Sequence, residues 1–208
     1  MIAAIENAIG AALGEAGTSG KLGYRYATID TYPDDFDLYL KDKKGALRFP
    51  AAWAVFLGLS NGDDDDTIWS GDARFALVVA AQNLRNETAS RHGDSVSPEA
   101  LPGSYQLAED AVRVLHRNDL GLDLVAPITA TGMRLVARTP EIRTQNLSLM
   151  AVELRCRMPI GGFDLDLGNF EELHVDWDIP PFGNVNPGGS GPLPAADPDA
   201  EDLIALPQ

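Results

Sequence analysis

The sequence of 208 residues has little that would suit a secreted or membrane-bound protein. It contains one cysteine, Cys156, which excludes an intrachain disulfide and is typical of proteins made in a reducing compartment. Its longest apolar run, Ala51–Leu59, is far shorter than the roughly 20 residues that cross a bilayer. The N-terminus has no basic start, and Glu6 interrupts its apolar residues, so we expect neither a secretory signal nor a membrane partner.

Basic residues are missing from the last quarter of the chain. No Lys or Arg follows Arg157, whereas residues 159–208 contain ten acidic residues. The net charge of −15 is therefore concentrated there, since the first 158 residues hold 21 acidic and 16 basic residues. Such a surface repels nucleic acid and anionic membranes. It suits a passage to which DNA must not bind, although acidity is also a common means of keeping a protein soluble, which is the simpler explanation.

Motifs of catalysis are also missing. The sequence has no GxSxG, HExxH, P-loop or GxGxxG pattern. Its three histidines, His92, His116 and His174, are far apart, and Cys156 alternates with apolar residues as a small core residue would. We therefore predict no enzyme, no catalytic residue, no cofactor and no metal. Convergence of distant side chains in the fold is the alternative left open.

The stretch Ala51–Ala81 has the clearest pattern of secondary structure in the sequence. Two apolar runs flank the sequence SNGDDDD, in which Asn61-Gly62 is a strong turn signal. The first run is apolar at nearly every position, as in a strand covered on both faces, and the second carries Phe75, Leu77 and Val79 at alternate positions. We predict a central β-hairpin with a long, exposed, acidic tip that contains Asp63, Asp64, Asp65 and Asp66.

Periodicity predicts further elements on both sides of this hairpin. Apolar residues at helical spacing indicate helices at 2–16 and 105–117, and alternation indicates strands at 22–31, 128–138 and 144–158. Ser104 is the expected cap of the second helix, and Asp34 that of a short helix after Pro33. A bulge is expected at Gly132. Residues 82–103 are polar and contain two prolines, so we expect a surface loop, with a short helix at its start.

These elements predict an α+β fold. The expected architecture is a mainly antiparallel sheet of four to five strands with two to three packed helices, in a domain of residues 1–158. An extended arm of residues 159–208, rich in Pro and Gly, follows it. The arm carries more hydrophobic residues than a disordered tail would, so we expect it to lie on another surface. Its expected anchors are Phe163, Leu165, Leu167, Phe170, Leu173, His174, Trp177, Ile179, Pro180, Pro181 and Phe182.

Three polar clusters allow a binding interpretation. His174, Asp176 and Asp178 alternate, as metal ligands on one face of a strand would, but no second motif accompanies them. The four consecutive Asp residues lack the alternate spacing of a Ca²⁺ loop. The third cluster is Asn83, Arg85 and Asn86 at a strand end. For all three we favour a solvated surface.

The order of several segments resembles a family from Mu-like phages and prophages that is associated with the tail-terminator or head–tail joining position. These segments are MIAAIENAI, RFPAAWAVF, ARFALVVAAQNLRNE, GSYQLAEDAVRVL and, most specifically, LHVDWDIPPFG with the acidic, Pro-rich end after it. They span nearly the whole chain, but the DDDD tip and residues 118–142 are not part of the match.

The resemblance implies a virion structural protein without enzymatic activity. Members of this class are small α+β domains that form a ring, commonly of six copies, at the head-proximal end of the tail. A ring of this kind would contact itself, the tail tube or sheath protein and the head–tail connector, while DNA passes through without specific binding. The implied location is the tail or neck of the virion, after synthesis in the host cytoplasm. The alternative is a monomeric acidic adaptor or assembly chaperone that binds a basic protein through its arm.

Overall fold

The computed structural model separates two units, Met1–Gly162 and Phe163–Gln208. The second unit contains a two-stranded antiparallel sheet, β6 (Glu172–Trp177) and β7 (Ala200–Ala205), for which only the backbone is described. Two segments of the predicted extended arm therefore pair as a hairpin. The structure describes residues 1–43, 45–65, 68–83, 87–93, 101–161, 172–177 and 200–205.

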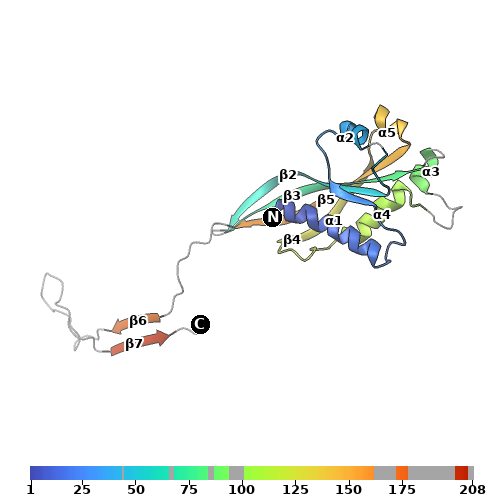
Figure 1. The fold of residues 1–208 in the computed structure, drawn as a ribbon. Helices are drawn as coiled ribbons and strands as arrows, with labels where there is room; N and C mark the ends of the chain where they lie inside the picture. Colours follow the sequence, from blue (N-terminus) through green and yellow to red (C-terminus); the bar gives the residue numbers. More distant parts are fainter. Residues whose placement is uncertain are drawn as a thin grey trace. The chain divides into compact units, whose positions relative to one another are not determined.

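A five-stranded mixed sheet forms the first unit, in the order β1-β2-β3-β5-β4 (Figure 1). Every neighbouring pair is antiparallel except β1 and β2, which are parallel. The prediction of an α+β fold with a mainly antiparallel sheet is thus confirmed. The strands are β1 (Thr28–Thr31), β2 (Ala51–Asp65), β3 (Ile68–Gln82), β4 (Ala126–Leu135) and β5 (Leu147–Gly161).

Two helices, α1 (Ile2–Thr18) and α4 (Ser104–Leu115), pack on one face of this sheet. In α1 the fully buried residues recur at helical spacing, as Ile5, Ile9 and Leu13. They join α4 and the strands in the larger apolar cluster, to which β3 contributes Phe75 and Leu77. Burial of this cluster is the main force that holds the helices on the sheet.

The opposite face is covered by the short helices α2 (Phe36–Asp42) and α5 (Pro140–Thr144). Trp53 is fully buried there, and its ring centroid lies 5.2 Å from that of Phe36 in an edge-to-face arrangement. Because β3 lies between two strands and under both layers, its residues from Phe75 to Ala81 are all buried. The prediction that the central hairpin is core is confirmed for residues 75–81 of β3 and for the start of β2.

The predicted turn at Asn61-Gly62 was wrong. The β2–β3 ladder continues past these residues, with Asp63 opposite Ser70 and Asp65 opposite Ile68. Asn61 has a positive φ of 52°, and the register shifts between Ser60 and Asp63, so the Asn-Gly pair forms a bulge within the strand. Asn61 does adopt the positive φ that a turn would require, but the hydrogen bonds of the β2–β3 ladder continue on both sides of it and keep the chain in the strand.

Other differences lie at element ends. The strand predicted at 22–31 is shorter in the structure. It forms β1 only from Thr28 to Thr31, the four residues that pair with β2. The strand predicted from residue 144 begins at Leu147, after the unpredicted helix α5, and continues to Gly161. The bulge in β4 is confirmed by a register shift between Ala130 and Gly132. In the loop region, the short helix is α3 (Glu87–His92).

Two predicted caps are corrected. Gly103 is the N-cap of α4, and Ser104 lies inside the helix, where its hydroxyl is buried 2.7 Å from that of Ser148 on β5. In α2 the cap is Asp35 and not Asp34, since the Asp35 carboxylate accepts a hydrogen bond from the Leu38 amide at 2.9 Å. The capping residue must have an extended backbone, which places it one residue later than predicted.

Replacing Asp35 with Ala should lower the free energy of unfolding by about 1 kcal/mol, because an orphan amide at the start of α2 loses its acceptor. Urea unfolding measures the change. The Asp34→Ala variant is the control, and it should remain within about 0.5 kcal/mol of the unmodified chain. An equal loss in both variants would contradict the assignment of the cap.

Candidate assembly interface

Three strands extend together beyond the helices and form a narrow end of the sheet, which we call the distal blade (Figure 1). It consists of residues 57–65 of β2, 68–74 of β3 and 155–161 of β5; the β3–β5 register is continuous, and the β2–β3 register shifts at Leu57 and between Ser60 and Asp63. Strands of 15 residues make this extension possible, since only part of their length lies under the helices. The two faces of the blade differ in chemistry.

One face of the blade is apolar. Trp69 and Ile160 are direct partners in the β3–β5 register and are 38% and 45% exposed, respectively. The Trp69 ring lies against Gly62, where an added Cβ would be only 2.1 Å from its Cζ2 atom. Leu59 lies beside the same ring, over Gly71. Apolar side chains of this size, gathered on one exposed face, are typical of a contact surface.

The other face of the blade is built around Asp72, which is 7% exposed. The Asn61 amide donates a hydrogen bond to the Asp72 carboxylate at 2.9 Å, and the Arg155 guanidinium donates to the same oxygen. Arg157 lies 3.9 Å from the second carboxylate oxygen and donates to the Ser70 hydroxyl at 3.1 Å. One buried carboxylate thus links all three strands of the blade.

This face has an excess of arginine. Arg74 is exposed, lies directly opposite Arg155 in the register and has no ion pair among the residues that the structure describes. Like charges at opposite positions destabilise a sheet, and Asp72 offsets part of that repulsion. We call Arg74, Arg155 and Arg157 the arginine face of the blade.

Hydrogen bonding lowers the pKa of the Asp72 carboxyl below its usual value, because the Asn61 amide and then the Arg155 guanidinium bind its ionised form. Cys156, on the neighbouring buried face of β5, shows the opposite effect. Burial raises the pKa of its thiol to about 11, which fits the predicted role as a small core residue. A thiol of this pKa is a poor nucleophile near neutral pH.

Asp72→Asn should remove a stabilising contribution that depends on pH. Because the folded-state pKa is lowered, that contribution is complete above the unfolded pKa of about 4 and is lost as the pH falls through the folded pKa. Urea unfolding from pH 7 to about pH 2 should therefore show a shallower acid limb in the variant, with lower stability at neutral pH. If the free energy of unfolding were the same for the variant and the unmodified chain at every pH, this role of Asp72 would be contradicted.

The acidic tip is only partly described. Asp63 is exposed, and its carboxylate lies 3.6 Å from the Arg157 guanidinium. Asp64 and Asp65 continue the β2 backbone opposite Trp69 and Ile68, while their side chains and the whole of Asp66 lie outside the described residues. The predicted exposure of the tip therefore agrees with the structure at Asp63 and stays a prediction for the other three.

The outer edge of β2 is open along the blade. Strand β1 pairs only with Ala51–Ala54, and the next free amide, that of Phe56, donates to the Glu6 carboxylate of α1 at 2.7 Å. From Leu57 to Asp65, no neighbouring strand within the described ranges pairs with this edge. Natural proteins usually cover or charge such an edge, because it can pair with another chain.

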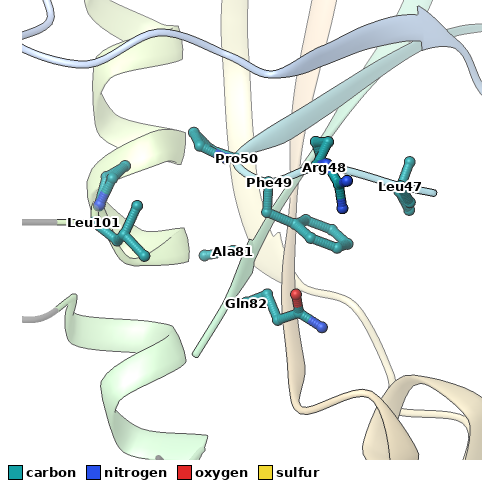
Figure 2. Close-up of a pocket in the computed structure, with 8 residues that line it drawn as sticks. Leu47, Arg48, Phe49, Pro50, Ala81, Gln82 and Leu101 are labelled. Carbon is teal, nitrogen blue, oxygen red and sulfur yellow. The ribbon is translucent and has the colours of Figure 1, made fainter. Parts of the chain in front are cut away.

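A separate hollow of about 230 Å³ lies where the segment before β2, the end of β3 and residues 101–102 meet (Figure 2). Most of its lining residues are apolar, among them Phe49, Pro50 and Leu101, and its two polar side chains are those of Arg48 and Gln82. Its polar side chains are engaged elsewhere, since Arg48 donates to the Gly45 carbonyl and Gln82 to that of Gln145. The hollow thus holds no group suited to acid–base or nucleophilic chemistry.

In the third cluster, the expected solvated surface was wrong for Asn83, which is buried directly after β3, while Arg85 and Asn86 lie outside the described residues. The other candidates from the sequence stay untested. Leu173, His174 and Trp177 are placed only as backbone positions of β6. Outside the described residues lie Phe163, Leu165, Leu167, Phe170, Asp178, Ile179, Pro180, Pro181 and Phe182.

Two searches of the described residues bear on function. No three His, Cys, Asp or Glu residues in the described ranges gather as a metal site would require. Among the helices in those ranges, none has both the length and the apolar character of a bilayer crossing. The described residues do build an exposed end of the sheet with one apolar face and one face rich in arginine.

Comparison with known proteins identifies the family. Residues 1–159 match the family model described as Bacteriophage Mu, Gp37, so the chain belongs to this family of Mu-like phages. Membership makes it a phage structural or morphogenesis protein and favours a role without catalysis. No curated protein matches the chain. The family resemblance predicted from the sequence is thus confirmed.

Proposed function

We propose that this protein is a tail terminator, a ring that closes the head-proximal end of a phage tail and joins it to the head connector. The observation that carries the proposal is the match of residues 1–159 to a Mu phage family. The exposed faces of the distal blade support it, because a non-catalytic domain with an open sheet edge and exposed Trp69 and Ile160 is suited to assembly.

A ring of identical copies needs two different, complementary surfaces on each copy, because each copy contacts its neighbours head to tail. The blade offers unlike faces, one apolar and one rich in arginine. We propose a ring of six copies, in which the C-terminal arm with its apolar anchors at residues 163–182 reaches a neighbouring copy or a tail protein. The proposed further partners are the tail tube or sheath protein and the connector.

Charge supports a passage for DNA. With a net charge of −15, the ring would repel the phosphate backbone along the whole transit, so that DNA passes without specific binding. We propose that the tip at Asp63–Asp66 faces the lumen or an adjoining ring. The proposed location is the neck of the virion, after synthesis in the host cytoplasm.

Replacing Asp63, Asp64, Asp65 and Asp66 together with Ser should change the free energy of unfolding by no more than about 0.5 kcal/mol. Asp63 is solvated, and its contact with Arg157 at 3.6 Å is of the exposed kind that contributes little. Thermal unfolding measures the effect. A loss of several kcal/mol would show that the tip is packed.

The proposal is tested by removing the protein from the phage. A ring that closes the tail and joins it to the head should be needed for both steps, so lysates without it should contain filled heads and separate tails. Electron microscopy of the lysate distinguishes these products, and the unmodified gene supplied in trans should restore joined particles. Normal joined particles in the absence of the protein would contradict the proposed function.

A further inference from the structure

The β6–β7 unit is a sheet of two strands, a structure that has little stability of its own in water. It consists of two strands of six residues each, and the described residues provide no third strand beside them. Isolated two-stranded hairpins are marginally stable at best in water, and they become stable when a further strand or an apolar surface joins them. The hairpin therefore needs a partner surface.

Its sequence defines the chemistry of that surface. Alternate residues of a strand share a face, and residues opposite each other in the register share it too. One face of the hairpin then holds Leu173, Val175, Trp177, Ala200, Asp202 and Ile204, and it is mainly apolar. The other face holds Glu172, His174, Asp176, Glu201, Leu203 and Ala205, with three acidic residues and no Lys or Arg.

The distal blade has the complementary pattern beside an open edge. Its apolar face carries Leu59, Trp69 and Ile160, and its opposite face is the arginine face. The free part of the β2 edge, Leu57–Asp65, spans about 30 Å, and a strand of six residues spans about 20 Å. Since Asp63–Asp65 occupy the distal end of this edge, the acidic hairpin would lie along residues 57–62. There it would continue the apolar face on one side and place its acidic positions near the Arg74 guanidinium, which lies over Gly58 of β2.

The other edge of the sheet is less suitable. Along the outer side of β4, the Ile128 amide donates to the Asn118 carbonyl at 2.9 Å, and the Arg117 amide donates to the Ile128 carbonyl at 2.7 Å. The Ala130 amide donates to His116 Nδ1 at 3.2 Å. These contacts occupy residues 128–130 of β4 and leave the shorter stretch Thr131–Leu135 for another strand, compared with Leu57–Asp65 on β2.

We propose that the β6–β7 hairpin of one copy adds to the outer edge of β2 in a second copy, and so extends the five-stranded sheet across the subunit boundary. Backbone hydrogen bonds provide the affinity, and the matching of apolar and charged faces sets the orientation. This contact deepens the proposed function, since it names the surface that receives the C-terminal arm in the ring. The proposed contact requires both strands of the hairpin, so β7, near the end of the chain, is as necessary for it as β6.

Disulfide trapping in solution tests the contact without tails. A full-length Ser60→Cys chain and a tagged full-length His174→Cys chain are mixed at high concentration and oxidised at about pH 8. Cys156 stays in place, because burial keeps its thiol unreactive there. We expect a mixed disulfide in several-fold higher yield than with Thr131→Cys on β4 as the receiving position.

Equal yields from the two receiving positions, or no mixed disulfide with Ser60→Cys, would overturn the proposal. Such a result would leave the tail-terminator function standing, because that function is tested separately by the products in lysates. The opposite combination is also distinguishable. If the disulfide formed as expected but lysates without the protein contained normal joined particles, the contact would stand and the proposed function would be contradicted.

Charge reversal tests the orientation. Arg74→Glu in the Ser60→Cys chain should lower the yield of the mixed disulfide about two- to fivefold, because a carboxylate would replace the guanidinium that extends over Gly58 of β2 toward the acidic face of the hairpin. Adding Asp176→Arg to the tagged chain should restore the yield. Lys41→Glu, at an exposed lysine of α2, is the matched control and should leave the yield unchanged. Equal yields for Arg74→Glu and Lys41→Glu would overturn the proposed matching of faces.

Discussion

A chain that ends at Gly162 should fold but fail to complete tails. Both apolar clusters and all five strands of the main sheet lie within residues 1–161, so the shortened chain keeps the contacts that make unfolding cooperative. It lacks the C-terminal arm, which we propose reaches a neighbouring copy or a tail protein. The yield of joined particles should therefore fall to that seen without the protein, as counted by electron microscopy.

The control for this truncation is a full-length chain in which the four Asp residues of the tip are replaced by Ser, which alters charge but retains the arm. Circular dichroism and thermal unfolding establish that both chains are folded. Joined particles at normal yield from the truncated chain would contradict the role of the arm. An unfolded truncated chain would contradict the division of the molecule at residue 162.

Phe75→Ala should destabilise the protein more than any exposed substitution in the blade. Phe75 is 1% exposed at the centre of β3, and its ring centroid lies 5.3 Å from that of Phe56 on β2. Truncation of a buried Phe to Ala costs about 3–5 kcal/mol, through lost burial and the cavity that remains. Urea unfolding should show this loss as a lower midpoint with an unchanged slope.

Leu57→Ala is the matched control, because Leu57 lies on the same hairpin but is 53% exposed at a bulge. Its removal should cost no more than about 0.5 kcal/mol. A small loss at Phe75, or equal losses at the two positions, would show that the centre of the hairpin is not the core.

The sequence predicted best where one periodicity extends over many residues. Ile5, Ile9 and Leu13 identified α1, and the alternation from Met150 to Met158 identified β5. It predicted less well where a local signal competed with pairing from a distant strand. Asn61-Gly62 has the residues of a tight turn, but β3 and β5 continue beside it, and it became a bulge. Short elements such as α5 are fixed by packing, here through Ile142, and not by periodicity.

The candidate interface was only partly visible in the sequence. Alternation predicted a strand at 144–158, which contains Arg155 and Arg157, but their link to Asp72 and Asn61 depends on the register of three strands. The one signal that was available is Asp72 itself, a charged residue directly before an apolar run. Trp69 was missed because the predicted turn left it outside both apolar runs, whereas β3 begins at Ile68.

The central claim is that this protein forms the ring at the junction of head and tail. Electron microscopy of intact particles whose protein carries a small tag at its N-terminus, with tag-directed gold, tests it most directly. We expect label at the neck, between the capsid and the head-proximal end of the tail, and six copies in the averaged density of that ring. Label along the tail tube, at the distal end of the tail or absent from the particle would contradict it.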